Sequence, residues 1–189
     1  MMDHVSFTDM SDGTREEYEF LVALEVEYAK KLADRLLAQL RNIANSYSGY
    51  MVSRLDHSLQ SATRAYRADE SEEMVVAALM HDIGDMLAPH SHSELAAAVL
   101  RPFVSEKTYW IAKHHGLFQT YTFAHHFGGD RNARDCFSDH PWYKDTIRFC
   151  EEYDANCFDP NYDHKPLEYF EPMVRRIFEV KEMASLDSR

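Results

Sequence analysis

The apolar residues of this chain recur at steps of three and four, and no stretch of useful length alternates apolar with polar side chains. Within 14–43 this spacing produces one apolar stripe, made of Phe20, Leu21, Leu24, Tyr28, Leu32, Leu36, Leu37, Leu40 and Ile43. Such a stripe is typical of an amphipathic helix or a helix pair. Half-buried strands would need period-two alternation. The chain is therefore predicted to be all-α.

Further helices are expected over 53–67, 74–80, 93–100, 108–115, 142–153 and 167–180. The helix over 74–80 is apolar on all sides, so it should be buried and should end near Gly84. Gly116 is expected to end the helix over 108–115. A chain of 189 residues has room for one ordinary domain. We assign 1–13 to a flexible N-terminal tail and 14–189 to a single helical domain.

The charge balance limits the classes of partner. A formal net charge of −12 repels nucleic-acid phosphates and anionic lipid headgroups, so neither nucleic acids nor membranes are expected as partners. No apolar stretch approaches the roughly 20 residues of a membrane helix. The start of the chain lacks a basic segment followed by an apolar one, so a cytoplasmic location is expected. The three cysteines form no CxxC pair, which indicates free thiols.

The chain has eleven histidines, and their positions suggest a metal site. His81 and Asp82 follow the most apolar predicted helix, where polar side chains are costly unless they are partnered. His57 lies on the preceding helix, and antiparallel packing would bring it close to His81. Asp154 approaches from a later helix. Imidazole and carboxylate without thiolate suit iron, manganese, zinc or cobalt.

A second set of histidines lies between these residues. His92 and His115 are at the start of one predicted helix and the end of the next, which is the same end of an antiparallel pair. A carboxylate between two histidine sets is the usual bridge between two ions. His90 and His114 are alternatives for the second set.

His57, His81-Asp82 and Asp154 resemble the pattern of the HD-domain metalloproteins, and residues 81–84 read HDIG. The resemblance implies a single HD-domain helical bundle, in which these four residues hold one ion. His92 and His115 resemble the second-ion ligands of the dinuclear branch, with Asp82 as the bridge. That branch contains two-metal phosphodiesterases and mixed-valent di-iron oxygenases.

Residues 47–57, YSGYMVSRLDH, resemble a segment of the HD-domain oxygenases that cleave 1-hydroxy-2-aminoalkylphosphonates. In those enzymes a tyrosine ten residues before the first ligand blocks one iron until substrate displaces it, and Tyr47 occupies this position. Tyr50 replaces a glutamate that contacts the substrate ammonium group. Asp85 replaces a histidine, and Gln119 replaces a lysine, at positions expected to contact the phosphonate.

Tyr50, together with Tyr121, Phe118, Phe123 and Phe127, suggests an aromatic cage for a quaternary ammonium group. The resemblance therefore favours the family member that converts 1-hydroxy-2-(trimethylammonio)ethylphosphonate and O2 into glycine betaine and phosphate. It implies two iron ions in the mixed-valent Fe(II)/Fe(III) state, with Tyr47 and Asp82 as catalytic residues. The expected substrate-binding residues are Tyr47, Tyr50, Asp85, Gln119, Tyr121, Arg131 and Arg134.

Two other functions are compatible with the residues. One is a two-metal phosphohydrolase of a small phosphoester, in which a bridging hydroxide attacks phosphorus. The other is a non-catalytic helical scaffold, although an intact ligand set disfavours it. The first helix over 14–43 could cap the bundle or form a dimer seam, so a monomer and a homodimer are both possible.

Overall fold

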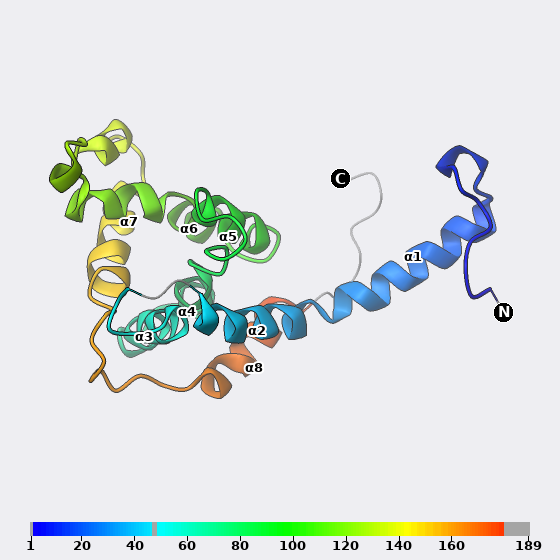
Figure 1. Cartoon of the computed structure of the whole chain (residues 1–189), viewed down its shortest axis with the longest axis horizontal. Helices are drawn as coiled ribbons and strands as arrows, with labels where there is room; N and C mark the ends of the chain where they lie inside the picture. The colour runs from blue at the N-terminus through cyan, green and yellow to red at the C-terminus, as the bar shows by residue number, and fades with distance from the viewer. Residues whose placement is uncertain (1, 47–48, 180–189) are drawn as a thin grey trace.

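The computed structural model describes residues 2–46 and 49–179, and its regular elements there are helices without strands, as predicted (Figure 1). The α-helices are α1 (Arg15–Lys30), α2 (Leu32–Asn42), α3 (Arg54–Arg67), α4 (Glu72–Met80), α5 (His92–Leu100), α6 (Glu106–Gln119), α7 (Tyr143–Phe149) and α8 (Leu167–Ile177). The predicted end of the last helix, Val180, lies outside the described residues. Every helix in the described part of the chain is too short or too polar to cross a lipid bilayer.

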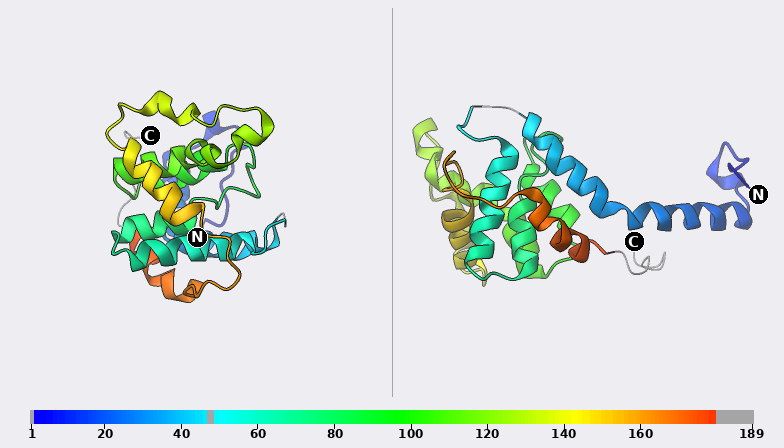
Figure 2. Two further views of the ribbon diagram at one scale, coloured as in Figure 1. Left: turned by 90° about the vertical axis from the view of Figure 1, so that its left-hand side faces the viewer. Right: turned by 90° about the horizontal axis from the view of Figure 1, so that it is seen from below.

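Helix α4 is the centre of the bundle. All its residues from Met74 to Met80 are buried, as the continuous apolar run predicts. Helix α3 packs beside α4. Helices α6 and α8 also contact α4, and α2 contacts α8 (Figure 2). The connection between α3 and α4 is short because Asp69 adopts a left-handed backbone conformation, with φ of 56°. This turn makes α3 and α4 antiparallel neighbours.

Helices α5, α6 and α7 form the other side of the domain (Figure 1). The prediction that Gly116 ends α6 is wrong, because α6 continues to Gln119. A Cβ atom at Gly116 would lie 2.5 Å from Oγ of Ser93 on α5, so a larger residue would displace that hydroxyl group. Gly116 therefore permits close packing of α5 against α6. The central helix, expected over 74–80 with its end near Gly84, ends at Met80, and turns carry the chain through Gly84.

Helix α7 ends in a π-helical segment, η6 (Cys150–Asp154). This segment contacts α3 and carries Asp154, which is buried at 3% exposure. Single π-helical turns are rare and occur often at functional sites. The sequence predicted a regular helix over 142–153. Only the structure shows the π-helical turn that places Asp154 in the core.

The predicted helix over 14–43 is a helix pair, with its break at Lys31. Leu36, Leu37 and Leu40 of α2 are buried in the core. Helix α1 instead projects from the domain (Figures 1 and 2), so Leu24 is 52% exposed and Tyr28 is 65% exposed. The apolar stripe is continuous in sequence, but only its second half contributes to the core.

The segment 2–13 contains a short 3-10 helix, η1 (Met10–Asp12), and contacts the start of α1. Thr14 and Glu17 form the capping box that the sequence predicts. The Glu17 carboxylate also accepts a hydrogen bond from the N–H of Ser6 at 2.6 Å. One carboxylate thus connects the helix start to the N-terminal segment.

We expect the contact between Glu17 and Ser6 to persist in moderately acidic solution. The N–H groups of Ser6 and Thr14 lower the pKa of Glu17 to about 2, from an ordinary value of 4.5. Because the pKa is lower in the folded state, the stabilisation is complete above 4.5 and is lost as the pH falls through about 2. NMR should show the Ser6 amide shift changing with a midpoint near 2. Glu17→Gln should remove this transition, Glu16→Gln should retain it, and a midpoint near 4.5 would contradict the assignment.

Candidate metal centre

The His-Asp pair follows directly from the end of α4. His81 and Asp82 are buried, with exposures of 0% and 5%. Gly84 lies in the same turn, and a Cβ atom there would come within 2.8 Å of the carbonyl oxygen of His92. Glycine therefore lets this turn approach the start of α5, which brings His92 toward Asp82.

One group of potential ligands consists of His57, His81 and Asp154, all of them buried. Nε2 of His57 lies 3.0 Å from Nε2 of His81 and 3.3 Å from Oδ1 of Asp154. Nε2 of His81 lies 3.7 Å from the same carboxylate oxygen. Ser53 and Asp56 form a capping box at the start of α3, which fixes the helical turn that carries His57. These three side chains could hold one metal ion.

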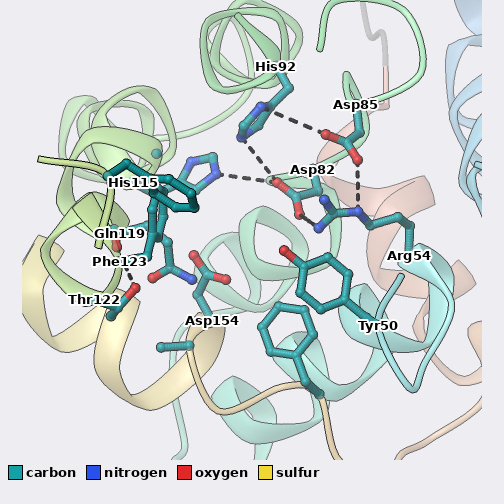
Figure 3. Close-up of a pocket in the computed structure, with 14 residues that line it drawn as sticks. Tyr50, Arg54, Asp82, Asp85, His92, His115, Gln119, Thr122, Phe123 and Asp154 are labelled. Atoms are coloured by element: carbon teal, nitrogen blue, oxygen red, sulfur yellow. Dashed lines mark hydrogen bonds and ion pairs between the residues drawn. The ribbon is translucent and has the colours of Figure 1, made fainter. Parts of the chain in front are cut away.

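A second group of potential ligands consists of His81, Asp82 and His115, and His92 approaches the same carboxylate (Figure 3). Oδ1 of Asp82 is 3.4 Å from Nε2 of His92 and 3.4 Å from Nε2 of His115. Oδ2 of Asp82 is 3.5 Å from Nε2 of His57 and 3.6 Å from Nε2 of His81. Each carboxylate oxygen thus faces a different pair of imidazoles.

Backbone carbonyls orient three of the four imidazoles. Nδ1 of His57 lies 3.1 Å from the carbonyl oxygen of Cys157. Nδ1 of His81 is 2.8 Å from the carbonyl of Ala78, and Nδ1 of His115 is 2.7 Å from that of Ala112. A carbonyl oxygen only accepts hydrogen bonds, so Nδ1 carries the proton in each ring. The Nε2 lone pairs therefore point toward the centre, as in metal-ligating histidines.

This donor set fits metal ions. In the neutral state Nε2 of His57 and Nε2 of His81 direct lone pairs at each other over 3.0 Å, which is repulsive without a cation between them. Ligands about 2.1 Å from one ion lie about 3.0 to 3.4 Å apart at right-angled or tetrahedral geometry, close to the spacings within both groups. Nitrogen and oxygen donors without sulfur suit iron, manganese, zinc or cobalt.

The carboxylates and imidazoles of the cluster stabilise one another's charged forms. Burial alone would raise the pKa of Asp82, but His81, His115 and His57 hold it well below its ordinary value. Burial alone would lower the pKa of His57, but its hydrogen bond to Asp154 and the charge of Asp82 raise it. Asp82 is therefore an anionic ligand at neutral pH, and protons compete with metal ions for the imidazoles.

A cavity of about 610 Å³ opens onto this cluster. Asp82, His92, His115 and Asp154 lie at its inner end (Figure 3). Its other lining residues are Tyr50, Arg54, Asp85, Gly116, Gln119, Thr122, Phe123, Phe127, Ala155 and Phe158. A small molecule could therefore reach the metal ligands directly.

Arg54 and Phe158 are among the lining residues that were missed from the sequence. Phe158 stacks on the ring of Tyr50 at 4.6 Å and on the ring of His57 at 4.5 Å. It lies in a loop after η6, where no periodicity indicates which way a side chain points. Arg54 lies one helical turn before His57, and this spacing could have indicated that both share one face of α3.

The structure divides the residues predicted to bind substrate. Tyr50, Asp85 and Gln119 line the cavity. Tyr121, Arg131 and Arg134 are not among its lining residues, because both guanidinium groups lie over the Tyr121 ring, at 4.2 and 3.8 Å from its centroid. Phe118 is fully buried in the core and cannot be part of a cage around a ligand. Tyr47 lies outside the described residues.

The alternative second pair of histidines points elsewhere. His114 stacks on Trp110 at 3.7 Å, and its Nδ1 donates to the Trp110 carbonyl. His90 is exposed. The structure therefore brings His92 and His115, rather than His90 and His114, to the carboxylate of Asp82.

A family model described as "HD domain" matches residues 54–152, which is just over half of the chain. The chain belongs to the HD-domain family. The matched segment includes His57, the His81-Asp82 pair, His92 and His115, and it ends two residues before Asp154. HD domains are typically metal-dependent enzymes, and this HD domain contains His/Asp groups that could hold metal. A search of curated proteins finds no match.

Proposed function

We propose that this HD domain is a di-iron oxygenase that cleaves the C–P bond of 1-hydroxy-2-(trimethylammonio)ethylphosphonate. The position of the Asp82 carboxylate carries the proposal, since its two oxygens face two different pairs of imidazoles at 3.4 to 3.6 Å. A carboxylate placed in this way serves as a bridge between two ions. This arrangement favours the dinuclear branch of the family over one-metal hydrolases.

Each metal-facing residue has a role in the proposal. His57, His81 and Asp154 would hold the first ion, His92 and His115 the second, and Asp82 both. The mixed-valent iron pair, when bound, supplies the redox chemistry with O2. The substrate and one O2 give glycine betaine and one phosphate, with both oxygen atoms entering the products. Tyr47 keeps the role that the family resemblance implies, as a ligand that substrate displaces.

The cavity wall supports a trimethylammonium substrate. Tyr50 and Phe158 stack on one another, and Phe123 and Phe127 line the same cavity. A quaternary ammonium group donates no hydrogen bonds, but aromatic faces attract it by about 0.5 to 1 kcal/mol at exposed sites, and Tyr50, Phe123 and Phe127 are exposed. Among the described lining residues, Arg54 alone is a lysine or an arginine. It pairs with Asp82 and Asp85, and its remaining N–H donors suit a phosphonate oxygen.

Phosphate release with and without O2 tests the proposal. Iron-loaded protein should release phosphate from 1-hydroxy-2-(trimethylammonio)ethylphosphonate only when O2 is present, with one O2 consumed per phosphate. A phosphomonoester should serve as the parallel substrate, because a two-metal phosphohydrolase would use the same Asp82 bridge. Oxygen-independent release from the ester, with the phosphonate intact, would replace the oxygenase proposal with the hydrolase.

Tyr50→Glu should shift substrate preference from the trimethylammonium compound toward the primary amine. The substitution removes an aromatic face and adds a carboxylate that accepts hydrogen bonds from a primary ammonium group. A cation–π contribution of about 0.5 to 1 kcal/mol at an exposed ring predicts about a two- to fivefold change in the ratio of kcat/KM values. Tyr50→Phe retains the ring and is the matched control. Equal ratios in all three proteins would refute the aromatic recognition.

A further inference from the structure

His92 differs from the other three imidazoles of the cluster in how its ring is oriented. His81 and His115 each donate from Nδ1 to a carbonyl three residues earlier in the chain. His92 is the first residue of α5, so no preceding helical turn supplies such a carbonyl. Its Nδ1 instead faces Oδ1 of Asp85 at 3.9 Å (Figure 3). The side chain of His92 is also 26% exposed, whereas that of His115 is 2% exposed.

Asp85 is itself held in place. Its Oδ2 lies 2.8 Å from Nε of Arg54, and Nη1 of Arg54 lies 3.3 Å from Oδ2 of Asp82. The side chains of Arg54 and Asp85 are only 18% and 16% exposed. Charges shielded from solvent interact more strongly than surface pairs. Arg54 therefore directs one Asp85 oxygen to itself and leaves the other toward His92.

The contact between Asp85 and His92 has a chemical consequence at the metal side of the ring. A separation of 3.9 Å is longer than a hydrogen bond, so the carboxylate acts through its charge. A negative charge beside Nδ1 favours the proton on that nitrogen. The lone pair then stays on Nε2, which lies 3.4 Å from Oδ1 of Asp82. A carboxylate that accepts a hydrogen bond from this nitrogen orients a metal-ligating histidine and increases its basicity, and the charge of Asp85 acts in the same direction from 3.9 Å.

We propose that Asp85, held by Arg54, is the positioning residue of the second metal ion. It acts through His92 and sets the affinity of the second ion without changing that of the first. The affinity of the first ion does not depend on such a carboxylate, because backbone carbonyls orient His57 and His81. The inference rests on the proposed function in requiring a second ion. It assigns Asp85 to the metal centre, whereas the sequence predicted contact with substrate.

Equilibrium titration of the metal-free protein with Co(II) tests this role. Wild-type protein should bind two ions. Asp85→Asn should bind the first with unchanged affinity and the second about 10-fold more weakly, the lower end of the effect of losing a hydrogen-bonded partner, since Asp85 acts through its charge. Asp85→Glu restores the negative charge and should recover most of the affinity for the second ion. Glu94→Gln removes an exposed carboxylate from α5, the helix that carries His92, and should match wild type. Thermal unfolding of each variant should be followed in parallel.

Each other result has a definite meaning. If Asp85→Asn binds the second ion as tightly as wild type, the inference fails and the proposed function stands. If Asp85→Asn weakens both ions together, the effect is not specific to the second ion and the inference is overturned, and a lower melting temperature would then show that Asp85 is structural. If wild-type protein binds a single ion, the dinuclear proposal itself fails and takes the inference with it.

Discussion

Asp82→Ala is expected to abolish metal binding by both ligand groups and to reduce activity about 1,000-fold or more, since bound metal supplies several kcal/mol of the catalytic effect. The reason is geometric. Within residues 2–46 and 49–179, Asp82 is the one carboxylate whose separate oxygens face His57 and His81 on one side and His92 and His115 on the other. Its removal takes an anionic ligand from each group at once.

Metal analysis after dialysis measures this effect directly. Asp82→Ala should retain less than one ion, and its far-UV circular dichroism should match wild type because the helices keep their packing. His57→Ala and Asp154→Ala should lose the first ion and activity. Asp139→Ala removes an exposed aspartate and should retain both ions. Two ions bound by Asp82→Ala would show that Asp82 is not the bridge.

Phe118→Ala should destabilise the fold by about 3 to 5 kcal/mol, the usual cost of removing a buried phenylalanine ring. Phe118 is fully buried on α6. The centroid of its ring lies 6.4 Å from that of Phe137 and 5.5 Å from that of Tyr143. Truncation would leave a cavity one turn from His115. It should also loosen the helix that positions that imidazole.

Urea denaturation at constant m-value measures the loss of stability. Leu87→Ala is the matched control, because Leu87 is 66% exposed and its truncation should change the free energy of unfolding by less than about 0.5 kcal/mol. A change below about 1 kcal/mol for Phe118→Ala would show that the neighbouring rings refill the space.

Local sequence patterns predicted much of the helical architecture. A period of three to four residues indicates a helix wherever it occurs, and the all-apolar run within 74–80 required burial. Thr14 and Glu17 marked the start of α1 because a capping box is formed within one turn. The role of Gly116 was predicted wrongly, because it depends on a contact between two helices and not on a local pattern. Its small size is needed for contact with Ser93 on another helix, which no local pattern reveals.

The substrate side of the cavity was less predictable. Arg131 and Arg134 looked suitable for an anion by residue type, but both lie over Tyr121. Arg54 and Phe158 line the cavity instead. Residue type indicates which chemistry a side chain can perform, whereas its direction depends on the elements packed around it.

The sequence by itself determined that the chain is helical and which histidines and aspartates were candidate ligands. These properties depend on local spacing and on residue chemistry. Tertiary structure alone decided that each oxygen of Asp82 faces a different histidine pair and that Asp85 lies beside His92. Those relations join α3, the turn after α4, α5, α6 and η6. They are set by helix packing and by the close approach at Gly84 and Gly116, since side chains far apart in sequence meet only when the core forms.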